Sequence, residues 1–471
     1  MKRSVLPGRL SRRTLARGVV LLLVLVLLTP SVASALTYEP SESESLQRGT
    51  VTDAAEGQTV VSTQGYTFRG NTNPKKPARL VALDERGRLN WTYQSRQGTD
   101  AWFFDVDPLP NGNLLVVSPR SGNTLVYELD PETKEREWEQ LLPYEDTHDV
   151  DMLNDTALVV SHMRAWNESR EVSNDEIVVY NLTTESVTWR WRYRNHFPNS
   201  TDGGMNHDWT HSNDVDAVGD DQFLVSPRNF DQVLLVNRTT KAIDMRLGED
   251  DNYSVLREQH NPDYLEGENG TPTMLVADSG NNRVVEYAYT NGTWTRTWSV
   301  GSESLNWPRD ADRLPNGNTL ITDTLNHRVI EVTPTGEVVW EYYATWGPYD
   351  AERVAHGDGS TGPTIREQNA TGTYEITGSA GLVAGSGQQT SVGTFITATV
   401  AGTPLAGVGE ELGTLWGHYA PWLRPVWMSG WDLFYAALAG LLLVGWLLTE
   451  AGVYGYHWAS SRSATGRATG R

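Results

Sequence analysis

Histidine and arginine side chains stand at matching positions of a recurring Asp-X-Asp pattern. The pattern occurs at Asp105/Asp107, Asp149/Asp151, Asp214/Asp216 and Asp310/Asp312, and Asp263 takes the second place of a fifth copy. The residues directly before the five copies are Phe104, His148, Asn213, His260 and Arg309, and His211 lies two residues before Asn213. Histidine serves as a nucleophile or proton carrier near neutral pH, and arginine binds oxyanions through its planar fork. These residue types together suit chemistry on an anionic group.

The elements that must position these residues repeat with a period of about 45 residues. Residues 278–286 (DSGNNRVVE) recur as residues 323–331 (DTLNHRVIE), and residues 109–113 (LPNGN) recur as residues 314–318. Each unit continues as short alternating strands and closes on a strand that carries a tryptophan, as at Trp138, Trp189, Trp298 and Trp340. Four short strands in 40–50 residues is the size of a β-propeller blade.

The repeat predicts an all-β fold, a six-bladed propeller over residues 50–345, with seven blades as the alternative. The expected blades are 50–95 (degenerate), 103–144, 148–197, 211–250, 258–301 and 307–344. The innermost strand of each blade lines the central channel, so the residues before the Asp-X-Asp copies should surround one opening. A single histidine at a blade start more often bonds a neighbouring strand, but three of the ten histidines in one ring favour a functional site.

Three short segments resemble the aryl sulfotransferase family of secreted six-bladed propellers. They are His148-Asp149, Trp209-Thr-His-Ser-Asn213 with Ser226-Pro-Arg228, and Gln259-His260. The resemblance extends over residues 100–345. It implies PAPS-independent transfer of a sulfuryl group from a phenolic sulfate ester to a phenolic acceptor. It also implies that no cofactor or metal takes part.

The resemblance further implies roles for individual residues. His260 would form a sulfohistidine, while His148, His211 and Arg228 would hold the sulfuryl oxygens and handle the phenol proton. Arg309, Asn213 and Phe104 are expected to contact the substrate. Two departures from the family pattern concern substrates and assembly: Asn261-Pro262 stands where the family has Asp, and residues 36–50 are too few for an N-terminal β-domain.

Other activities fit the sequence less well. The Asn-Arg-Val-Val-Glu repeats also look like the NHL type of propeller, so a membrane-tethered binding module is the alternative function. A quinone-dependent dehydrogenase would need a cofactor platform, for which the sequence has no clear signature. Residues 358–362 (DGSTG) lack the first glycine of a nucleophile elbow, and no His-Glu-X-X-His motif occurs.

Composition excludes several further classes. The chain has 59 acidic and 38 basic residues, a net charge of −21, and no cysteine. Nucleic-acid binding needs a basic face, and disulfides, thiolate nucleophiles and Cys-ligated metals need cysteine. An acidic, lysine-poor surface suits a protein in molar salt, which predicts a halophilic protein. The aryl sulfotransferases that the chain resembles would then be of the haloarchaeal, membrane-anchored type. The acidic turns are expected to belong to this solvated surface rather than to calcium sites.

The two ends predict attachment to a membrane. Residues 1–35 fit a signal peptide or a retained signal anchor, with a twin-arginine-like segment at residues 11–15. Residues 433–449 fit one transmembrane helix, preceded by a Gly/Thr/Ser-rich stalk and membrane-proximal segment at 346–425 and followed by a basic cytoplasmic tail at 457–471. The propeller should therefore lie outside the cell membrane, held by one or two spans, and its ten Asn-X-Ser/Thr sequons predict a glycoprotein.

Overall fold

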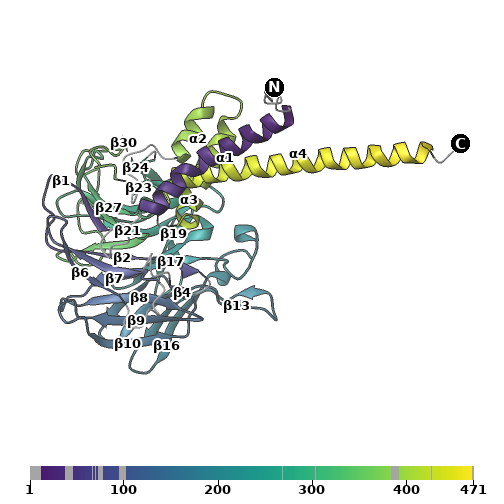
Figure 1. The fold of residues 1–471 in the computed structure, drawn as a ribbon. Coiled ribbons are helices and arrows are strands. Elements are labelled where there is room, and N and C mark those ends of the chain that lie inside the picture. The colour runs from purple at the N-terminus through teal and green to yellow at the C-terminus, as the bar shows by residue number, and fades with distance from the viewer. Residues whose placement is uncertain are drawn as a thin grey trace. The chain divides into compact units, whose positions relative to one another are not determined.

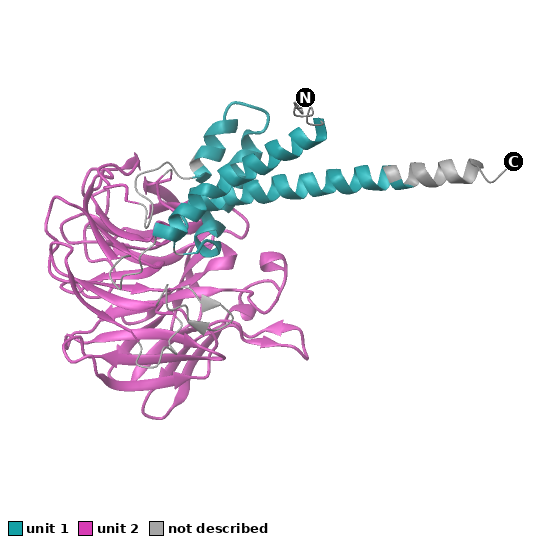
Figure 2. Cartoon of the chain, viewed as in Figure 1, with its two compact units in different colours: residues 1–40, 389–471 teal, residues 41–388 magenta. Residues whose placement is uncertain are grey.

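The computed structural model consists of two compact units, which Figure 2 shows in different colours. The larger unit comprises residues 41–388, and the smaller unit comprises residues 1–40 and 389–471. The structure describes residues 12–37, 46–65, 67–68, 71–72, 78–94, 102–267, 269–302, 304–382, 392–425 and 427–468. The basic residues Lys2, Arg3, Arg9 and Arg471 and the start of the twin-arginine-like segment lie outside the described residues.

The larger unit is a six-bladed β-propeller, as the repeat predicts, and the described residues contain no seventh blade. Each blade is an antiparallel sheet of four strands, and Figure 1 shows β7 to β10 side by side as one of them. Five blades have their strands in chain order: β7 (Asp105–Pro108), β8 (Leu114–Arg120), β9 (Asn123–Leu129) and β10 (Arg136–Leu142); β11 (Val150–Asn154), β12 (Ala157–His162), β15 (Glu176–Asn181) and β16 (Ser186–Arg192); β17 (Ser212–Val218), β18 (Gln222–Pro227), β19 (Gln232–Asn237) and β20 (Ile243–Gly248); β21 (His260–Glu266), β22 (Pro272–Asp278), β23 (Arg283–Thr290) and β24 (Thr293–Val300); β25 (Pro308–Arg313), β26 (Thr319–Asp323), β27 (Arg328–Val332) and β28 (Val338–Ala344).

The remaining blade joins the two ends of the propeller. Its outer strands β2 (Thr59–Thr63), β5 (Arg79–Leu83) and β6 (Leu89–Tyr93) come from the N-terminal side, and its innermost strand is β29 (Pro348–Arg353). The pair β2–β29 is antiparallel and closes the ring. The propeller therefore extends beyond residue 345, the boundary expected from the sequence, because blade 50–95 takes its fourth strand from a distant segment.

Short strands supplement the blades. β1 (Leu46–Val51) pairs with β28, and β30 (Gly372–Tyr374) runs parallel to β24. Ile365, in the segment between β29 and β30, is fully buried among core residues of β21 to β28. Two small hairpins complete the described strands: β3 (Thr67–Phe68) with β4 (Asn71–Thr72), and β13 (Trp166–Asn167) with β14 (Val172–Ser173). Part of the segment expected to be a stalk thus belongs to the propeller.

Tryptophans on β16 and β24 bond the blade that follows their own. Trp189 and Trp191 on β16 donate to the carbonyls of Arg238 and Lys241 in the next blade, at 2.7 and 3.0 Å. Trp298 on β24 donates to the Pro334 carbonyl at 2.8 Å. A large apolar ring in the space between two sheets, with its N–H bonded to a turn, satisfies both the apolar and the polar part of the side chain.

The smaller unit consists of helices, so the chain as a whole is mixed rather than all-β. Its helices are α1 (Arg12–Thr37), α2 (Val392–Val400), α3 (Ala406–Leu423) and α4 (Gly430–Ala468). Helices α2 and α3 lie within the segment that the sequence assigns to a Gly/Thr/Ser-rich stalk and a membrane-proximal segment. The threonines of α2 fit a helix because their hydroxyls bond the carbonyl four residues earlier, as Thr397 does with Gly393. A Cβ on Gly393 would lie 2.7 Å from the Gly413 carbonyl oxygen, so glycine permits the close approach of α2 and α3.

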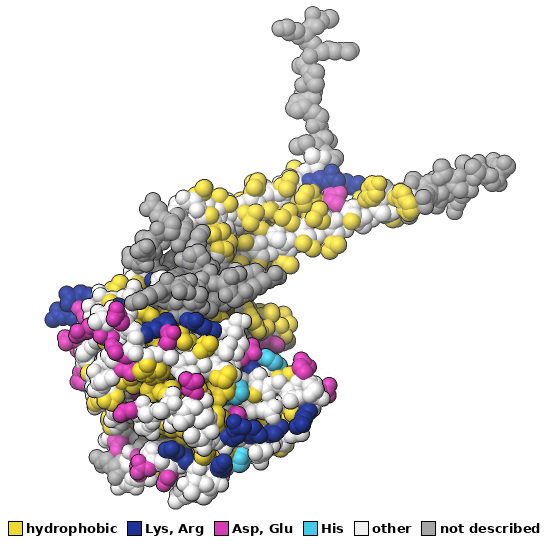
Figure 3. Space-filling view, turned by 90° about the horizontal axis from the view of Figure 1, so that it is seen from below, with side chains coloured by type: hydrophobic (Ala, Val, Ile, Leu, Met, Phe, Trp, Pro, Cys, Tyr) yellow, Lys and Arg dark blue, Asp and Glu magenta, His cyan; other side chains and the backbone are white. Residues whose placement is uncertain are grey.

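Helices α1 and α4 pack against each other in antiparallel fashion. Arg17, near the start of α1, forms two hydrogen bonds of 2.7 Å with Glu450. Near the other end, Ser34 donates to Asp432 at 2.8 Å. Both helices are long and apolar enough to cross a membrane, and α4 contains the expected span 433–449. On the face drawn in Figure 3, hydrophobic side chains cover the long helices, whereas acidic and basic side chains are scattered over the propeller.

Candidate active site

The residues before the Asp-X-Asp copies stand at the starts of the innermost strands, and Tyr349 of β29 completes their ring. The Tyr349 hydroxyl lies 2.9 Å from Nδ1 of His148. The ring of Phe104 packs on both, at centroid distances of 3.9 Å from His148 and 4.7 Å from Tyr349. All three side chains are buried. Phe104 therefore forms an apolar wall that fixes the orientation of the two polar rings.

The hydrogen bonds of His260 determine which of its ring nitrogens carries the proton. Nδ1 lies 3.1 Å from the Glu258 carbonyl and 2.8 Å from the Ser279 hydroxyl. A carbonyl only accepts, and the Ser279 hydroxyl donates to the Pro308 carbonyl. Both partners thus require Nδ1–H of His260 as the donor, which leaves Nε2 unprotonated in the neutral ring. An unprotonated imidazole nitrogen is a nucleophile.

His211 and His148 each have a carboxylate beside them. Nδ1 of His211 lies 2.9 Å from both carboxylate oxygens of Asp208, and Nε2 of His148 lies 3.7 Å from Asp146. Arg164 joins the two carboxylates, at 2.9 Å from Asp146 and 3.1 Å from Asp208. The centroids of the two histidine rings are 5.1 Å apart. The carboxylates and Arg164 thus hold the imidazoles of His148 and His211 next to each other, edge to face.

The backbone is strained next to these side chains. His211 has φ +39°, Asn261 has φ +29° and Glu258 has φ +46°, values that non-glycine residues rarely adopt. Strand β17 has a register shift between Ser212 and Val215, and β21 has one between His260 and Asp263. Strain and bulges of this kind cluster at functional sites because they redirect side chains.

Two arginines give the site its positive charge. Burial lowers the pKa of His260 well below its usual value, and Arg309 and Arg228 lower it further. The same causes, burial first and Arg228 second, lower the pKa of His211 to about 3. Burial also lowers the pKa of His148. The histidines are therefore neutral at physiological pH, while the arginines retain their charge.

Each arginine is held by its neighbours. Arg228, in the turn after β18, donates to the Asn229 side chain at 2.9 and 3.1 Å. Arg309 donates to Gln64 at 2.6 Å, and its guanidinium lies 4.6 Å from the centroid of the Tyr349 ring. Guanidinium groups that are fixed in this way are suited to binding the oxygens of a tetrahedral anion.

The other residues of the three sequence segments hold the strands rather than line the site. The Asn213 amide donates to the Gln259 carbonyl at 2.9 Å, directly before His260. The Gln259 amide in turn donates to Ser226 at 3.1 Å and to the Gln232 carbonyl at 2.6 Å. Asn213 is therefore placed to position His260 through its amide nitrogen, while its amide oxygen has no hydrogen-bond partner among the described residues.

The Asp-X-Asp residues are not part of a solvated surface. A cavity in the propeller is lined by twelve acidic side chains, the last from the segment after β29. Those at the first position are Asp105, Asp149, Asp214, Asp310 and Asp350, those at the second are Asp107, Asp151, Asp216, Asp263, Asp312 and Glu352, and the last is Asp358. The expectation of a solvated surface is thus corrected, because these acids lie on the innermost strands of a closed ring.

Sequence reasoning missed Tyr349, Asp146, Asp208 and Arg164. A signal for Tyr349 was available, since it directly precedes Asp350-Ala-Glu352, a conservative variant of the Asp-X-Asp pattern. Asp146 and Asp208 lie two and three residues before their histidines, but nothing in the sequence shows that a carboxylate so placed turns back toward the imidazole. Arg164 lies on a connection between β12 and β13 and has no periodic signal.

Comparisons with known proteins give the following matches. No curated protein matches the chain. Similar solved structures include a protein of unknown function from Bacteroides caccae (14% identity, 63% of this chain and 98% of that chain, TM-score 0.42). They also include virginiamycin B lyase from Staphylococcus aureus (10% identity, 61% and 85%, TM-score 0.38). Residues 52–261, which contain His148, His211, Arg228 and His260, match the model of the Arylsulfotransferase (ASST) family.

Proposed function

We propose that the propeller transfers a sulfuryl group from an aryl sulfate ester to a phenol through His260. The observation that carries the proposal is the fixed Nδ1–H of His260, bonded to the Glu258 carbonyl and the Ser279 hydroxyl. It leaves Nε2 with a free electron pair at neutral pH. The match of residues 52–261 to the Arylsulfotransferase (ASST) model supports the same activity.

In the first half-reaction Nε2 of His260 attacks sulfur, and the bond between sulfur and the aryl oxygen breaks. The sulfuryl group is then bonded to Nε2, and the phenolate leaves with the electron pair. Arg228 and Arg309 are proposed to hold the sulfuryl oxygens, since charge that spreads over them in the transition state is stabilised by preorganised cations. Phe104 and the Tyr349 ring offer an apolar face beside the aryl group.

In the second half-reaction a phenol oxygen attacks sulfur, and Nε2 of His260 leaves as the neutral imidazole. His148 or His211 accepts the proton of the attacking phenol and returns it to the phenolate that leaves in the next cycle. The negative charge of a bound sulfate ester favours the protonated imidazole, which brings the pKa of these buried histidines back toward the range useful for proton transfer. Atoms and protons therefore balance over one cycle without a cofactor.

The test uses the full chain in detergent and molar KCl, with 4-nitrophenyl sulfate as donor and phenol as acceptor. We expect nitrophenol release that depends on phenol, together with formation of phenyl sulfate. His260→Ala should reduce release to background, and ³⁵S-labelled donor should label the wild-type protein but not this variant. His356→Gln is the matched control, because His356 pairs with Glu56 at 3.2 Å, away from the cluster.

Two results would contradict the proposal. Undiminished transfer by His260→Ala would remove His260 as the nucleophile. No release with any phenol, from protein whose circular dichroism shows the folded propeller, would favour the membrane-tethered binding module, with the histidines as ligand contacts.

We also propose that the propeller is anchored on the outer face of a cell membrane by both α1 and α4. The two helices are long and apolar enough to span, and they pair at both ends through Arg17–Glu450 and Ser34–Asp432. An antiparallel pair puts the N-terminal basic residues and the C-terminal tail on the same side, which the positive-inside rule assigns to the cytoplasm.

A further inference from the structure

The acidic cavity follows directly from the positions of the site residues. Along five of the six innermost strands the site residue comes first, the first acid follows it, and the second acid lies two residues further on; on β21 Asn261 follows His260 and only Asp263 is acidic. A strand rises about 3.3 Å per residue, so the carboxylates form layers within the channel beside the histidine and arginine ring. This concentration of like charge is unrelated to sulfuryl transfer and needs its own explanation.

Several of these carboxylates link neighbouring blades, and each does so through one of its two oxygens. Asp149 accepts the amide N–H of Val215, and Asp151 accepts that of Ala217 at 2.8 Å. Asp350 accepts the amide N–H of Val106 at 3.0 Å. These bonds explain why an acid is useful at the inner edge of a blade, but they use only one oxygen of each carboxylate.

Other oxygens of the same cavity have no hydrogen-bond partner. One of them is Oδ2 of Asp214, whose residue is only 4% exposed. The amide oxygen of Asn261, which lines the same cavity, is also without a partner. A buried carboxyl or amide oxygen without a partner is destabilising, so these atoms point to a ligand that they could bind.

Arg313 and Arg353 interact electrostatically with Asp263 and Asp312 of the cavity, but each forms its ion pair with an acid outside it. Arg313 pairs with Glu286 at 3.2 Å, and Arg353 pairs with Glu331 at 2.7 Å. The cavity therefore favours a species that brings positive charge to the carboxylates, which could be a proton or a metal ion. The distances between the carboxylate oxygens decide between the two.

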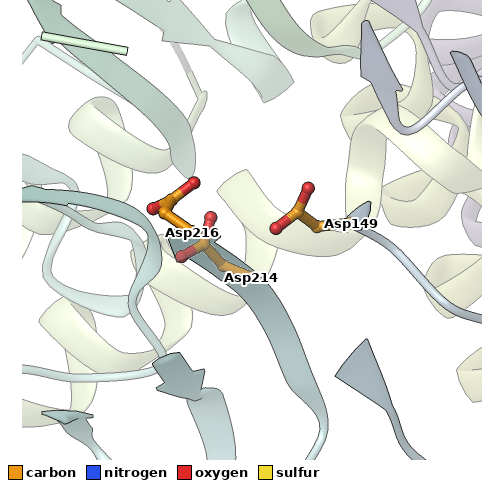
Figure 4. Close-up of side chains that lie close together, drawn as sticks. All are labelled: Asp149, Asp214 and Asp216. Carbon is orange, nitrogen blue, oxygen red and sulfur yellow. The ribbon is translucent and has the colours of Figure 1, made fainter. Parts of the chain in front are cut away.

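We propose that Asp149, Asp214 and Asp216 bind a Ca²⁺ ion in the propeller channel. One oxygen from each residue lies within 4.8 Å of the others, and Figure 4 shows the three side chains turned toward a common space. Oxygens on a sphere of about 2.4 Å radius, the usual Ca²⁺–oxygen distance, are at most about 4.8 Å apart. The unpartnered Oδ2 of Asp214 and the amide oxygen of Asn261 are the kinds of oxygen that Ca²⁺ prefers.

The cavity has room for such an ion together with water. Its free space is about 30 Å³ for the centres of water-sized particles, and one water needs roughly 10–15 Å³ on this measure. Ca²⁺ tolerates irregular ligand sets, whereas Mg²⁺ demands a near-ideal octahedron. Asp149 precedes β11 and the other two acids lie on β17, so the ion would join two neighbouring blades at their inner edges.

The experiment measures Ca²⁺ binding to the full chain in detergent after treatment with EDTA. Dialysis against ⁴⁵Ca²⁺ in 2 M KCl should find about one ion per chain, because molar salt suppresses weak binding to exposed acids. Ca²⁺ should also raise the melting temperature, since a ligand that binds only the folded state stabilises it. EDTA should reverse the shift.

Variants then assign the ion to these residues. Asp214→Asn and Asp216→Asn should each weaken Ca²⁺ binding at least tenfold and abolish most of the melting shift. Asp220→Asn is the matched control, because Asp220 is an exposed acid of the same blade, and it should bind Ca²⁺ as the wild type does. No stoichiometric binding in 2 M KCl by the wild type, or equal binding by Asp214→Asn, would overturn the proposal. Neither readout depends on sulfuryl transfer.

Discussion

The Tyr349 hydroxyl lies 2.9 Å from Nδ1 of His148, although 201 residues separate them in the chain. Tyr349 begins the strand that closes the ring, and His148 begins the blade two places further on. The contact therefore exists only when the propeller is closed. It makes the geometry of one histidine depend on the pairing of β29 with β2.

Replacing Tyr349 by phenylalanine should reduce activity without unfolding the protein. The ring stays in contact with Phe104 and Arg309, but His148 loses one partner. A neutral hydrogen bond contributes about 0.5–1.5 kcal/mol, so kcat/KM should fall about three- to tenfold, while the melting temperature changes little. Steady-state assays with 4-nitrophenyl sulfate and phenol check this. A loss as large as that of His260→Ala would instead make Tyr349 a catalytic residue.

Arg228→Lys should show whether a bidentate cation is needed. Lysine keeps the charge but presents no planar fork to the sulfuryl oxygens. We expect a fall of about tenfold or more in kcat, of the order of one charge-assisted hydrogen bond, with a smaller change in KM. Arg238→Lys is a suitable control, because Arg238 is on the same blade and bonds the Asp220 carbonyl. Equal kcat values for the Arg228→Lys variant and the wild type would show that charge alone suffices.

Because folding lowers the pKa of His211, the free energy of unfolding should fall as the pH falls. Burial, followed by Arg228, lowers its pKa to about 3, whereas the pKa of histidine in an unfolded chain is about 6.5. Below pH 6.5 the unfolded chain therefore binds a proton that the folded chain does not. The stability contributed by neutral His211 is complete above pH 6.5 and is lost as the pH falls toward 3.

Comparison with His211→Gln isolates this effect from the many carboxylates that titrate in the opposite sense. The difference in unfolding free energy between the wild type and the variant should shrink by about 1 kcal/mol per pH unit below pH 6.5. Chemical unfolding in detergent at pH 7.5, 6.5 and 5.5 measures it. A difference that does not change with pH would mean that folding does not lower the pKa of His211.

The sequence predicts most of the blades because their strands are local. Hairpins within residues 103–344 repeat the same turn, the same acids and the same tryptophans, and each blade contains all of its strands. The remaining blade fails this condition, since β29 lies 285 residues beyond the strand it pairs with, from Thr63 to Pro348. No local pattern specifies that pairing, although Asp350-Ala-Glu352 repeats the acidic pattern of the other innermost strands.

The candidate site is predictable in its residues but not in its environment. His148, His211 and His260 follow from the spacing and Arg228 from the resemblance to the aryl sulfotransferase family, and the structure gathers them with Arg309 and Tyr349. The burial of the acids could not be foreseen, because acidic residues are rarely buried without a partner and a strand pattern does not reveal whether its polar face meets water or a closed channel. Only ring closure turns the six innermost strands toward one another.

Removing β29 should therefore prevent folding. A chain that ends at residue 345 leaves β2, whose five residues are all buried, without its inner neighbour. An unpaired buried strand invites aggregation. We expect residues 41–345 to be insoluble or unfolded and residues 41–388, the compact unit, to be soluble and cooperative by circular dichroism and gel filtration in molar KCl. Normal folding of the shorter chain would show that ring closure is dispensable.

The pairing of α1 with α4 predicts that the N-terminal helix is retained in the mature protein. Cleavage after Ala35 would remove Arg17 and Ser34, the partners of Glu450 and Asp432, and would leave Glu450 without its ion pair in the middle of a lone apolar helix. Burial of an unpaired charge in a membrane is costly, so selection should favour keeping both helices. Mass spectrometry of the protein extracted from membranes should therefore find peptides from residues 18–37.

Glu450→Gln, which removes the charge pair, should lower the fraction of the chain that stays in the membrane after alkaline extraction, whereas Glu410→Gln on α3 should not. A mature N-terminus at Leu36 would show instead that α1 is a cleaved signal and that α4 alone holds the propeller.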